Sequence, residues 1–342
     1  MPSPRFWRRA LVAVAIAASV AGCAASSAKT GPEQRGSASS RDPTDPLSAL
    51  RLYISPESPA ALQVEAWRAL GKSADAVALE QIAREPTATW LTGGPRPESA
   101  SAALVRQSSQ AGATAEIVLY DIPDRDCNGY SGGGAANGSE YLAWVTQVAR
   151  GIGDHTAIII LEPDAIDQAA SGCLSSSGAA LRYRQLAQAV TILKANRRAH
   201  VYIDAGNSGW LPVPRMIAPL LAAGVLRADG FALNVANFQS TRASIAYGEA
   251  LSARLGGRHF VIDTSRNGVG APSSQPGVHQ WCNPPGRALG VAPTTHTGYA
   301  PVDAFLWIKY PGESDGQCGS GDPPAGTWWP AYGLQLARTS DR

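Results

Sequence analysis

Six short apolar runs in this chain each end on a charged or amide side chain, and this pattern limits the folds that the chain can adopt. The polar residues that close the runs are Asp121, Glu162, Asp204, Asn234, Asp263 and Lys309. Short runs rich in Ile, Val and Leu are typical of strands buried on both faces of a parallel sheet. Parallel α/β folds place their chemistry at the carboxyl ends of strands, so the pattern predicts an enzyme with a carboxylate-lined cleft. For any single run, an ordinary turn opened by Asp or Asn is the alternative.

The runs alternate with Ala- and Leu-rich segments from Leu47 onward, which predicts one (β/α) barrel. Two further runs, Leu50–Ile54 and Thr87–Leu91, raise the number of predicted strands to eight. Helices are predicted in the intervening segments Ala60–Leu70, Ala100–Gln110, Glu140–Gly151, Gly178–Ala195, Pro214–Ala223 and Arg242–Gly256. An open doubly wound sheet is the alternative. No Gly-x-Gly-x-x-Gly motif follows the first predicted strand, so a dinucleotide-binding fold has little support.

Residues 1–23 have the pattern of an export signal. Arg5, Arg8 and Arg9 precede an apolar segment from Ala10 to Ala21, which is too short to span a bilayer as a stable helix. The sequence Val-Ala-Gly-Cys that ends at Cys23 resembles a bacterial lipobox, which implies cleavage before Cys23 and lipidation of its sulfur. We therefore expect a lipoprotein on the outer face of the cell membrane. Ordinary signal cleavage and secretion of a soluble protein is the alternative.

The segment after the leader, residues 24–46, is rich in Ser, Ala, Gly and Pro and has no apolar period, which predicts a flexible tether. Residues 47–342 would then form the single catalytic domain. The chain carries 29 Lys and Arg residues against 27 Asp and Glu residues, and three of the arginines lie in the leader. No basic stripe remains, so a nucleic acid is not an expected partner. We expect a monomer that meets the membrane only through the lipid at Cys23.

Four cysteines remain once Cys23 is set aside, and an exported protein meets an oxidising compartment. They are Cys127, Cys173, Cys282 and Cys318. An even number predicts two disulfides, for which three pairings are possible. A zinc site is the competing interpretation. It lacks a close Cys-x-x-Cys pair or a matched His pair, so we expect no metal and no cofactor.

The densest group of reactive side chains lies between Tyr120 and Cys127, where three carboxylates and Arg125 follow a predicted strand. A glycine-rich stretch that begins at Ser131 comes next and is suited to a mobile loop. Carboxylates crowded in this way cannot all ionise cheaply, so one of them has a raised pKa unless Arg125 or Arg266 compensates. A carboxyl group with a raised pKa is what a general acid needs near neutral pH.

Carboxylates at the other strand ends extend this group. Asp164, Asp204, Asp263 and the segment Lys309–Gly316 all follow predicted strands. Paired carboxylates beside an extended cleft are the equipment of glycoside hydrolysis. Three tryptophans near strand ends or loops could stack on sugar faces, although a tryptophan more commonly packs in a core. They are Trp90, Trp210 and Trp281.

Seven ordered blocks of this sequence resemble glycoside hydrolase family 6, the cellulases that cleave β-1,4-glucan with inversion. The blocks are Tyr120–Cys127, Glu162–Asp164, Asp204–Trp210, Asn234–Asn237, Asp263–Gly268, Trp281–Asn283 and Lys309–Gly316. They span nearly the whole predicted domain. The resemblance implies a distorted, TIM-like barrel with fewer than eight fully paired strands. It also implies the disulfides Cys127–Cys173 and Cys282–Cys318.

The resemblance further implies roles for single residues. Asp164 would be the general acid, Asp126 would hold up the pKa of Asp164 and help to relay a proton, and Asp315 would be the proposed base. Ser131 would steer the attacking water. The expected substrate contacts are Tyr120 at the cleavage point, Trp210 on the acceptor side, Trp90, Trp281, Lys309 and Glu313 on the donor side, and Asn234. Arg125, Arg266, Asp204 and Asp263 would supply supporting charge.

The sequence departs from the family pattern at three places. Asn207 stands where many members carry His, and Tyr310 stands where Pro is common. Only Gly316 and Gln317 separate Asp315 from Cys318, where cellobiohydrolases of the family carry a long loop that roofs the cleft. The short connection implies an open groove and therefore an endo-acting β-1,4-glucanase. Three alternatives stay open: a cellobiohydrolase, a non-catalytic glycan-binding lipoprotein on the same scaffold, and a metal-dependent hydrolase that uses the same aspartates.

Overall fold

A computed structural model describes residues 46–273 and 280–340. The described residues belong to one compact unit, Ser40–Arg342. The predicted leader, the lipidation site at Cys23 and residues 24–45 of the predicted tether lie outside the described residues. No helix among the described residues is long and apolar enough to cross a membrane.

The described part of the chain is built on one parallel sheet, and its strands follow one another in chain order. The strands are β1 (Thr89–Leu91), β2 (Ala115–Leu119), β3 (Ala157–Leu161), β4 (Ala199–Asp204), β5 (Gly230–Leu233), β6 (His259–Asp263) and β7 (Val302–Leu306). Leu119 pairs with Leu161, and Leu161 pairs with Ile203, so the carboxyl ends of the central strands stand level. This register brings the polar residues that follow the strands to one rim of the sheet.

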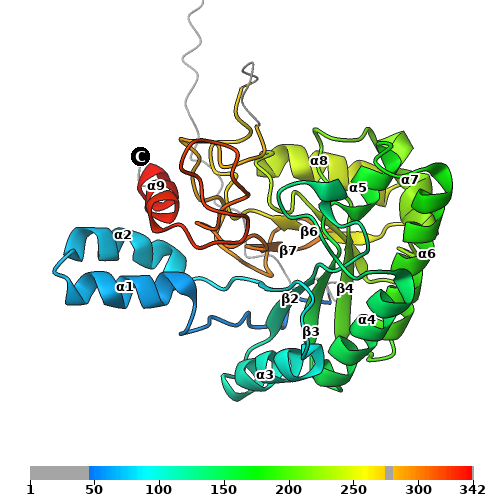
Figure 1. Ribbon diagram of the computed structural model, residues 1–342, viewed down its shortest axis with the longest axis horizontal. Coiled ribbons are helices and arrows are strands. Elements are labelled where there is room, and N and C mark those ends of the chain that lie inside the picture. Colours follow the sequence, from blue (N-terminus) through cyan, green and yellow to red (C-terminus); the bar gives the residue numbers. More distant parts are fainter. Residues whose placement is uncertain (1–45, 274–279, 341–342) are drawn as a thin grey trace, which may run out of the picture. The chain divides into compact units, whose positions relative to one another are not determined.

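Helices cover the outer face of the sheet. They are α3 (Pro97–Gln110), α4 (Gly138–Ile152), α5 (Ala165–Ala170), α6 (Ser176–Leu193), α7 (Val213–Ala222) and α8 (Thr241–Ser252). Figure 1 shows α4, α6 and α7 following one another along the sheet. Alternate strand residues such as Ile117, Ile159 and Val201 pack against these helices in the larger core cluster. The remaining strand residues, among them Val118 and Ile160, fill the concave side. Because both faces of the sheet are buried, the sequences of the strands are continuous apolar runs.

A third cluster lies beside the sheet, where the hairpin α1 (Pro59–Ala69) and α2 (Ser73–Ala83) packs near α9 (Pro330–Ser340) (Figure 1). Trp307 and Tyr310, which follow β7, are part of this cluster. The Tyr310 hydroxyl accepts a hydrogen bond from the Ala60 N–H at 2.9 Å. Tyr310 therefore anchors α1, which gives this departure from the family pattern a structural role.

The sheet is a curled half-barrel, which confirms the prediction of a distorted, TIM-like barrel in a single domain. Among the described strands, no ladder joins β1 to β7. The two edges are in contact through the Ala88 N–H, just before β1, which donates to the Trp307 carbonyl, just after β7, at 3.1 Å. The strand predicted at Leu50–Ile54 is wrong, because this segment forms only a single bridge from Leu52 to Thr114. Leu47 and Leu52 are buried on the concave side, so burial explains their apolar character without a strand.

The six predicted helices all occur, with ends shifted by a few residues. Sequence reasoning missed α2, α5 and α9. The helix α5 has six residues and begins directly after Asp164, so it is too short to show a helical period. Its presence matters because it fixes the backbone next to the proposed general acid.

Candidate active site

The loops that follow the strands contain an unusual concentration of strained backbone. Nine described residues other than glycine have a positive φ: Asp124, Asp126, Cys127, Asn128, Glu162, Asp164, Asn234, Ala236 and Asn283. Side chains rarely tolerate this region, and each such residue costs on the order of 1–3 kcal/mol. Strain of this kind collects where a fold holds side chains in fixed positions for function. Here it marks the carboxyl-end rim of the sheet.

A cleft of about 560 Å³ opens at this rim. The structure brings nine of the predicted site residues into its lining: Trp90, Tyr120, Asp126, Ser131, Asp164, Trp210, Trp281, Lys309 and Asp315. All three aspartates with predicted catalytic roles are therefore in one cavity. No cluster of three His, Cys, Asp or Glu side chains that could hold a metal ion occurs in the part of the chain that the structure describes.

Asp164 lies at the start of α5 in a left-handed conformation, with φ of 68°. Its N–H donates to Asp204 Oδ2 at 2.8 Å, so the end of β4 holds the residue in place. Burial raises the pKa of the Asp164 carboxyl well above its usual value, and the nearby carboxyls of Asp204, Asp126 and Asp315 raise it further. Asp164 is thus suited to remain protonated near neutral pH and to donate a proton.

Glu162 anchors the loop rather than lining the cleft. Its carboxyl is fully buried and accepts hydrogen bonds from the N–H groups of Asp121 and Ile122, each at 3.1 Å. Burial raises its pKa to about 8, although the two backbone donors oppose this shift. Glu162 therefore ties the residues after β2 to the end of β3, which fixes the origin of the loop that carries Asp126.

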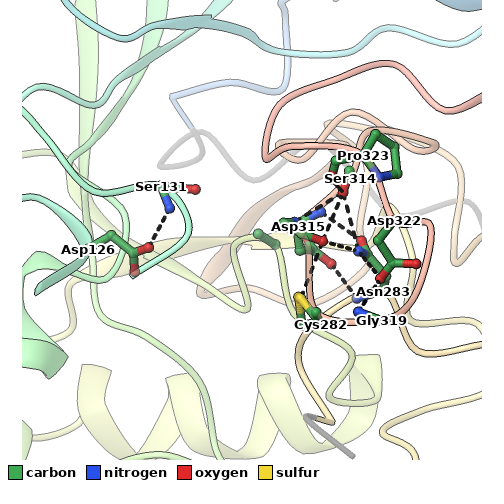
Figure 2. The surroundings of a disulfide bond; sticks show 12 residues. Asp126, Ser131, Cys282, Asn283, Ser314, Asp315, Gly319, Asp322 and Pro323 are labelled. Carbon is green, nitrogen blue, oxygen red and sulfur yellow. Dashed lines mark hydrogen bonds between the residues drawn. A yellow bond between two sulfur atoms is a disulfide. The ribbon is translucent and has the colours of Figure 1, made fainter. Parts of the chain in front are cut away.

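Asp126 is held within its own loop. Its Oδ2 accepts from the Ser131 N–H at 2.7 Å (Figure 2), and its Oδ1 accepts from Gln168 Nε2 at 3.2 Å. Arg125 supports the same loop, because it donates to the carbonyls of Ser131 at 2.9 Å and Tyr120 at 2.7 Å. The disulfide Cys127–Cys173, one of the two pairings that the resemblance implies, closes this region. These contacts keep Ser131 beside the Asp126 carboxylate.

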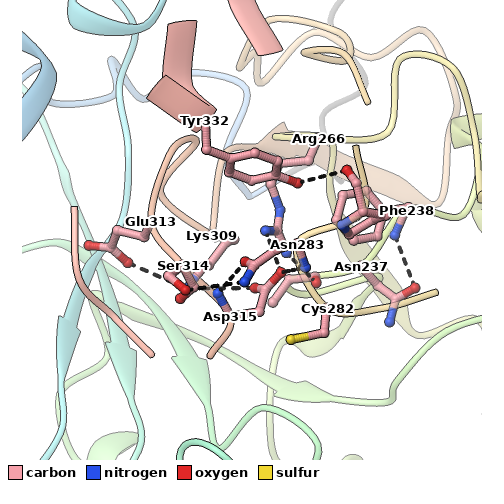
Figure 3. A network of polar contacts seen from close by, with 12 residues as sticks. Asn237, Phe238, Arg266, Cys282, Asn283, Lys309, Glu313, Ser314, Asp315 and Tyr332 are labelled. Carbon is pink, nitrogen blue, oxygen red and sulfur yellow. Dashed lines mark hydrogen bonds and ion pairs between the residues drawn. The ribbon is translucent and has the colours of Figure 1, made fainter. Parts of the chain in front are cut away.

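Asp315 is held by a buried arginine. Arg266 has no exposed surface, and its Nη1 donates to Asp315 Oδ2 at 2.8 Å (Figure 3). The same oxygen accepts from the Asn283 N–H at 3.0 Å, and the Asp315 N–H donates back to Asn283 Oδ1 at 2.7 Å. Lys309 Nζ lies 4.0 Å from Asp315 Oδ1 and 3.5 Å from Glu313 Oε2. One carboxylate oxygen of Asp315 is therefore occupied, and the other can face the cleft.

The second implied disulfide, Cys282–Cys318, joins the segment that contains Asn283 to the loop that carries Asp315. Asn283, next to Cys282, also donates to the Gly316 carbonyl at 2.7 Å and to Asp322 at 3.0 Å (Figure 2). Sequence reasoning quoted this asparagine only as part of a matching block and gave it no role. Its φ of 45° and its five hydrogen bonds, which include one to the Ser314 hydroxyl, show that it shapes the Asp315 loop.

The aromatic residues line the cleft in two groups. Trp90 packs edge to face on Tyr120, with ring centroids 5.2 Å apart, and Lys309 Nζ lies 5.7 Å from the centre of the Trp90 ring. Trp281 contacts Tyr130 at a centroid separation of 6.1 Å. Tyr130 belongs to the Asp126 loop, and Trp281 is next to Cys282, which is bonded to Cys318 at the end of the Asp315 loop. The contact between the two rings therefore links the two loops at their solvent-exposed edge.

Six predicted residues do not line the cleft. They are Arg125, Arg266 and Glu313, whose contacts are given above, and Asp204, Asn234 and Asp263. The Asn234 side chain is fully buried and binds backbone groups, donating to the Asp263 carbonyl at 2.9 Å and accepting from the Gln239 N–H at 3.0 Å. Asp263 accepts from the N–H groups of Lys309 and Ala236, both at 2.9 Å. Asp204 likewise binds backbone N–H groups. Sequence reasoning missed several residues that do line the cleft, namely Gln168, Asn237 and Gln239.

Comparison with known proteins shows the family to which this chain is similar. The family model described as "Glycosyl hydrolases family 6" matches residues 47–340. Endoglucanase A of Cellulomonas fimi is 44% identical over 278 residues, which are 80% of this chain and 59% of that protein. Endoglucanase 1 of Streptomyces halstedii is 36% identical over 86% of this chain and 90% of its own length. The chain thus spans about three fifths of the first relative and most of the second.

A solved structure is also similar. The endoglucanase Cel6 from Mycobacterium tuberculosis, in complex with methyl-cellobiosyl-4-deoxy-4-thio-β-cellobioside, superposes with a TM-score of 0.82 at 42% sequence identity. The match covers 87% of this chain and all of that chain. The similarity to this structure therefore extends over most of the chain.

Proposed function

The chain belongs to glycosyl hydrolase family 6, and we propose that it hydrolyses internal β-1,4-glucosidic bonds of cellulose or a related β-glucan with inversion at the anomeric carbon. The observation that carries this proposal is that Asp164, whose pKa is raised by burial and by neighbouring carboxyls, lies in one cleft with Asp126, Asp315 and aromatic rings. An inverting hydrolase needs a carboxylic acid on one side of the bond and an activated water on the other.

Asp164 acts as the general acid. Its proton passes to the oxygen that bridges two glucose units while the bond from the anomeric carbon to that oxygen breaks. A water molecule attacks the same carbon from the opposite face and gives up a proton, which leaves a hydroxyl of inverted configuration. Tyr120, buried beside the cleft and packed against Trp90, restricts the sugar at the cleavage point.

Asp315 is positioned to accept the proton of the water through Oδ1, because its Oδ2 is occupied by Arg266 and Asn283. Ser131 and Asp126 lie in the same cleft and can orient the water or relay the proton of the water to Asp315. Lys309 and Glu313 bind sugar hydroxyls on the donor side, and Trp210 stacks on the acceptor side. No cofactor enters these steps.

Endo action is supported by the connection between Asp315 and Cys318, which at two residues is too short to form a long roof over the groove. The test is loss of viscosity of carboxymethyl-cellulose followed together with release of reducing ends. A steep fall in viscosity at low reducing-sugar yield is expected. Slow viscosity loss with abundant cellobiose would instead identify a cellobiohydrolase.

The role of Asp164 is tested with Asp164→Asn, which keeps the shape of the side chain and removes its proton. We expect hydrolysis of cellotetraose to fall by at least about a thousandfold, because the leaving oxygen would depart without a proton. Proton NMR of the fresh products should show the α-anomer at the new reducing end. Full activity of the variant, or β-anomers as first products, would contradict the proposal. Equal glucan binding by both proteins with no hydrolysis by either would indicate a binding protein.

We also propose that residues 1–23 direct export and that Cys23 carries the lipid anchor, with residues 24–46 as the tether and residues 47–342 as a monomeric catalytic domain. The two disulfides are consistent with an oxidising compartment. Cys23→Ala should move the protein from the membrane fraction to the medium. Retention in the membrane fraction would contradict a lipid anchor at this cysteine.

A further inference from the structure

Asp167 is a buried carboxyl group to which the proposed mechanism gives no role. It lies on α5, three residues after Asp164, and has no exposed surface. Neither of its carboxyl oxygens has a hydrogen-bond partner among the described residues. Leaving such a group unpaired costs on the order of 1–3 kcal/mol or more, so its position needs an explanation.

Gly206, which follows β4, lies against this carboxyl. A Cβ atom at position 206 would lie 2.2 Å from Asp167 Oδ2, and the φ of Gly206 is +63°. Only glycine can therefore occupy this position while Asp167 stays in place. The Gly206 N–H in turn donates to Asp204 Oδ2 at 3.2 Å. Gly206 therefore lies next to both carboxyl groups, with its N–H bound to Asp204 and its Cβ position directed at Asp167.

Asp204 is the other incompletely satisfied group at this point. Its Oδ2 accepts from the N–H groups of Asp164 and Gly206, whereas its Oδ1 is buried without a partner among the described residues. Two adjacent buried carboxyls cannot both be ionised without a cation, and no described Lys or Arg forms an ion pair with either. The pair must therefore hold a proton.

We propose that Asp167 is a positioning residue that holds this proton and donates it in a hydrogen bond to Oδ1 of Asp204, so that Asp204 stays ionised beneath the general acid. The assignment follows from the donors: Asp204 accepts two backbone N–H groups that stabilise a carboxylate, and Asp167 has no comparable set. Sharing the proton in this way satisfies the open oxygen of Asp204 and one oxygen of Asp167.

The proposed hydrogen bond affects the pKa of Asp164. The Asp204 carboxyl is the largest contribution after burial to the raised pKa of Asp164. Burial also raises the pKa of Asp204 itself to about 7, so Asp204 loses its charge near neutral pH unless a donor supports it. An Asp167 proton that stabilises the Asp204 carboxylate therefore keeps Asp164 protonated to higher pH. This inference rests on the proposed role of Asp164 as general acid.

The other titratable groups around Asp167 do not supply this donor. Asp164 directly precedes the same helix, and the phenols of Tyr183 on α6 and Tyr247 on α8 are also within electrostatic reach of Asp167. The Tyr247 hydroxyl is already committed to the Leu211 carbonyl at 2.8 Å. On α7, Arg215 binds the Ala170 carbonyl at the far end of α5.

The test compares Asp167→Leu with Asp167→Asn by the pH dependence of kcat/KM on cellotetraose. Leu removes the donor, so Asp204 becomes neutral and the alkaline limb of the profile moves to lower pH by about one unit. Asn keeps an N–H donor of the same shape, so the limb should stay within about 0.2 units of the wild type. Asp154→Leu, a change at an exposed aspartate, is the control and should not move the limb.

Each other outcome overturns the inference. An equal shift in both Asp167 variants would mean that Asp167 acts through its own negative charge. No shift in either, with a uniform loss of rate, would mean that it only packs. If Asp167→Leu does not fold, Asp167→Ala is measured with the same expectations. Activity of Asp164→Asn would overturn the inference together with the acid assignment, whereas an inactive Asp164→Asn with an unmoved Asp167→Leu profile would overturn the inference alone.

Discussion

At the scale of single residues, the site depends on how each aspartate is held. Asp126 accepts hydrogen bonds from neutral donors, Asp164 is surrounded by other carboxyls, and Asp315 is paired with a buried guanidinium. These different surroundings fit the different roles that we propose for three chemically similar side chains, because burial and like charge favour the protonated form that the proposed acid Asp164 needs.

Arg266→Lys tests this separation. Arg266 donates to Asp315 Oδ2 at 2.8 Å and to the Ala236 carbonyl at 2.6 Å, and a lysine cannot reproduce both bonds from one ammonium group. We expect kcat on cellotetraose to fall by about 10- to 100-fold with a smaller change in KM. Arg287→Lys is the matched control, because Arg287 also donates to a carbonyl, that of Gly270, but forms no ion pair with a carboxylate among the described residues. Equal losses in the two variants would show that the effect is general destabilisation.

At the scale of elements, the two disulfide-closed loops are fitted to each other. Gly316 directly follows Asp315, and a Cβ atom there would lie 2.4 Å from the Cβ of Tyr130 on the opposite loop. The Tyr130 ring also contacts Trp281. The glycine therefore permits Tyr130, and with it the adjacent Ser131, to approach the Asp315 loop.

Gly316→Ala should displace Tyr130 and loosen Ser131 from Asp126, which we expect to lower kcat/KM on cellotetraose by about tenfold. Gly321→Ala is the control, because Gly321 also has a positive φ of +86° but has open space where the Cβ would be placed. It carries the backbone strain alone, on the order of 1 kcal/mol. The double variant Gly316→Ala/Tyr130→Ala should recover part of the loss. If the two glycine variants behave alike, the contact with Tyr130 has no catalytic importance.

The elements also show how far sequence reasoning reaches. The buried strands could be predicted because burial on both faces produces uninterrupted apolar runs, and the polar residue after each run does lie at the rim. What the sequence could not distinguish is whether such a residue faces the cleft or the backbone. Asp164 and Asn234 both follow strands with a positive φ, yet only Asp164 lines the cleft. That difference depends on contacts between loops distant in sequence, as does the role of Asn283.

At the scale of the whole molecule, the half-barrel buries ionisable groups that have no part in catalysis. Glu116 lies on β2 and is only 4% exposed, and both of its carboxyl oxygens lack partners among the described residues. Burial raises its pKa to about 8, with a further contribution from Asp263. The protein therefore binds a proton at Glu116 that the unfolded chain releases near its ordinary pKa of about 4.3.

The pH dependence of stability follows from this difference. Because the folded-state pKa is the higher one, the protonated Glu116 is fully compatible with folding below about pH 4, and stability is lost as the pH rises toward 8. The loss is at most about 1.4 kcal/mol per pH unit in that window. Glu116→Gln has a similar shape and no proton to lose. We expect its melting temperature to match that of the wild type near pH 5 and to exceed it by several degrees at pH 8.

Thermal unfolding followed by circular dichroism at several pH values between 4 and 9 measures this difference. Glu57→Gln, at an exposed position, is the matched control and should leave the wild-type curve unchanged. Glu162 and Asp204 also have raised pKa values and remain in the Glu116 variant, so its melting temperature should still fall with pH, but less steeply than that of the wild type. Parallel curves for Glu116→Gln and the wild type would mean that Glu116 is ionised in the fold and that water or a rearranged donor reaches its carboxylate.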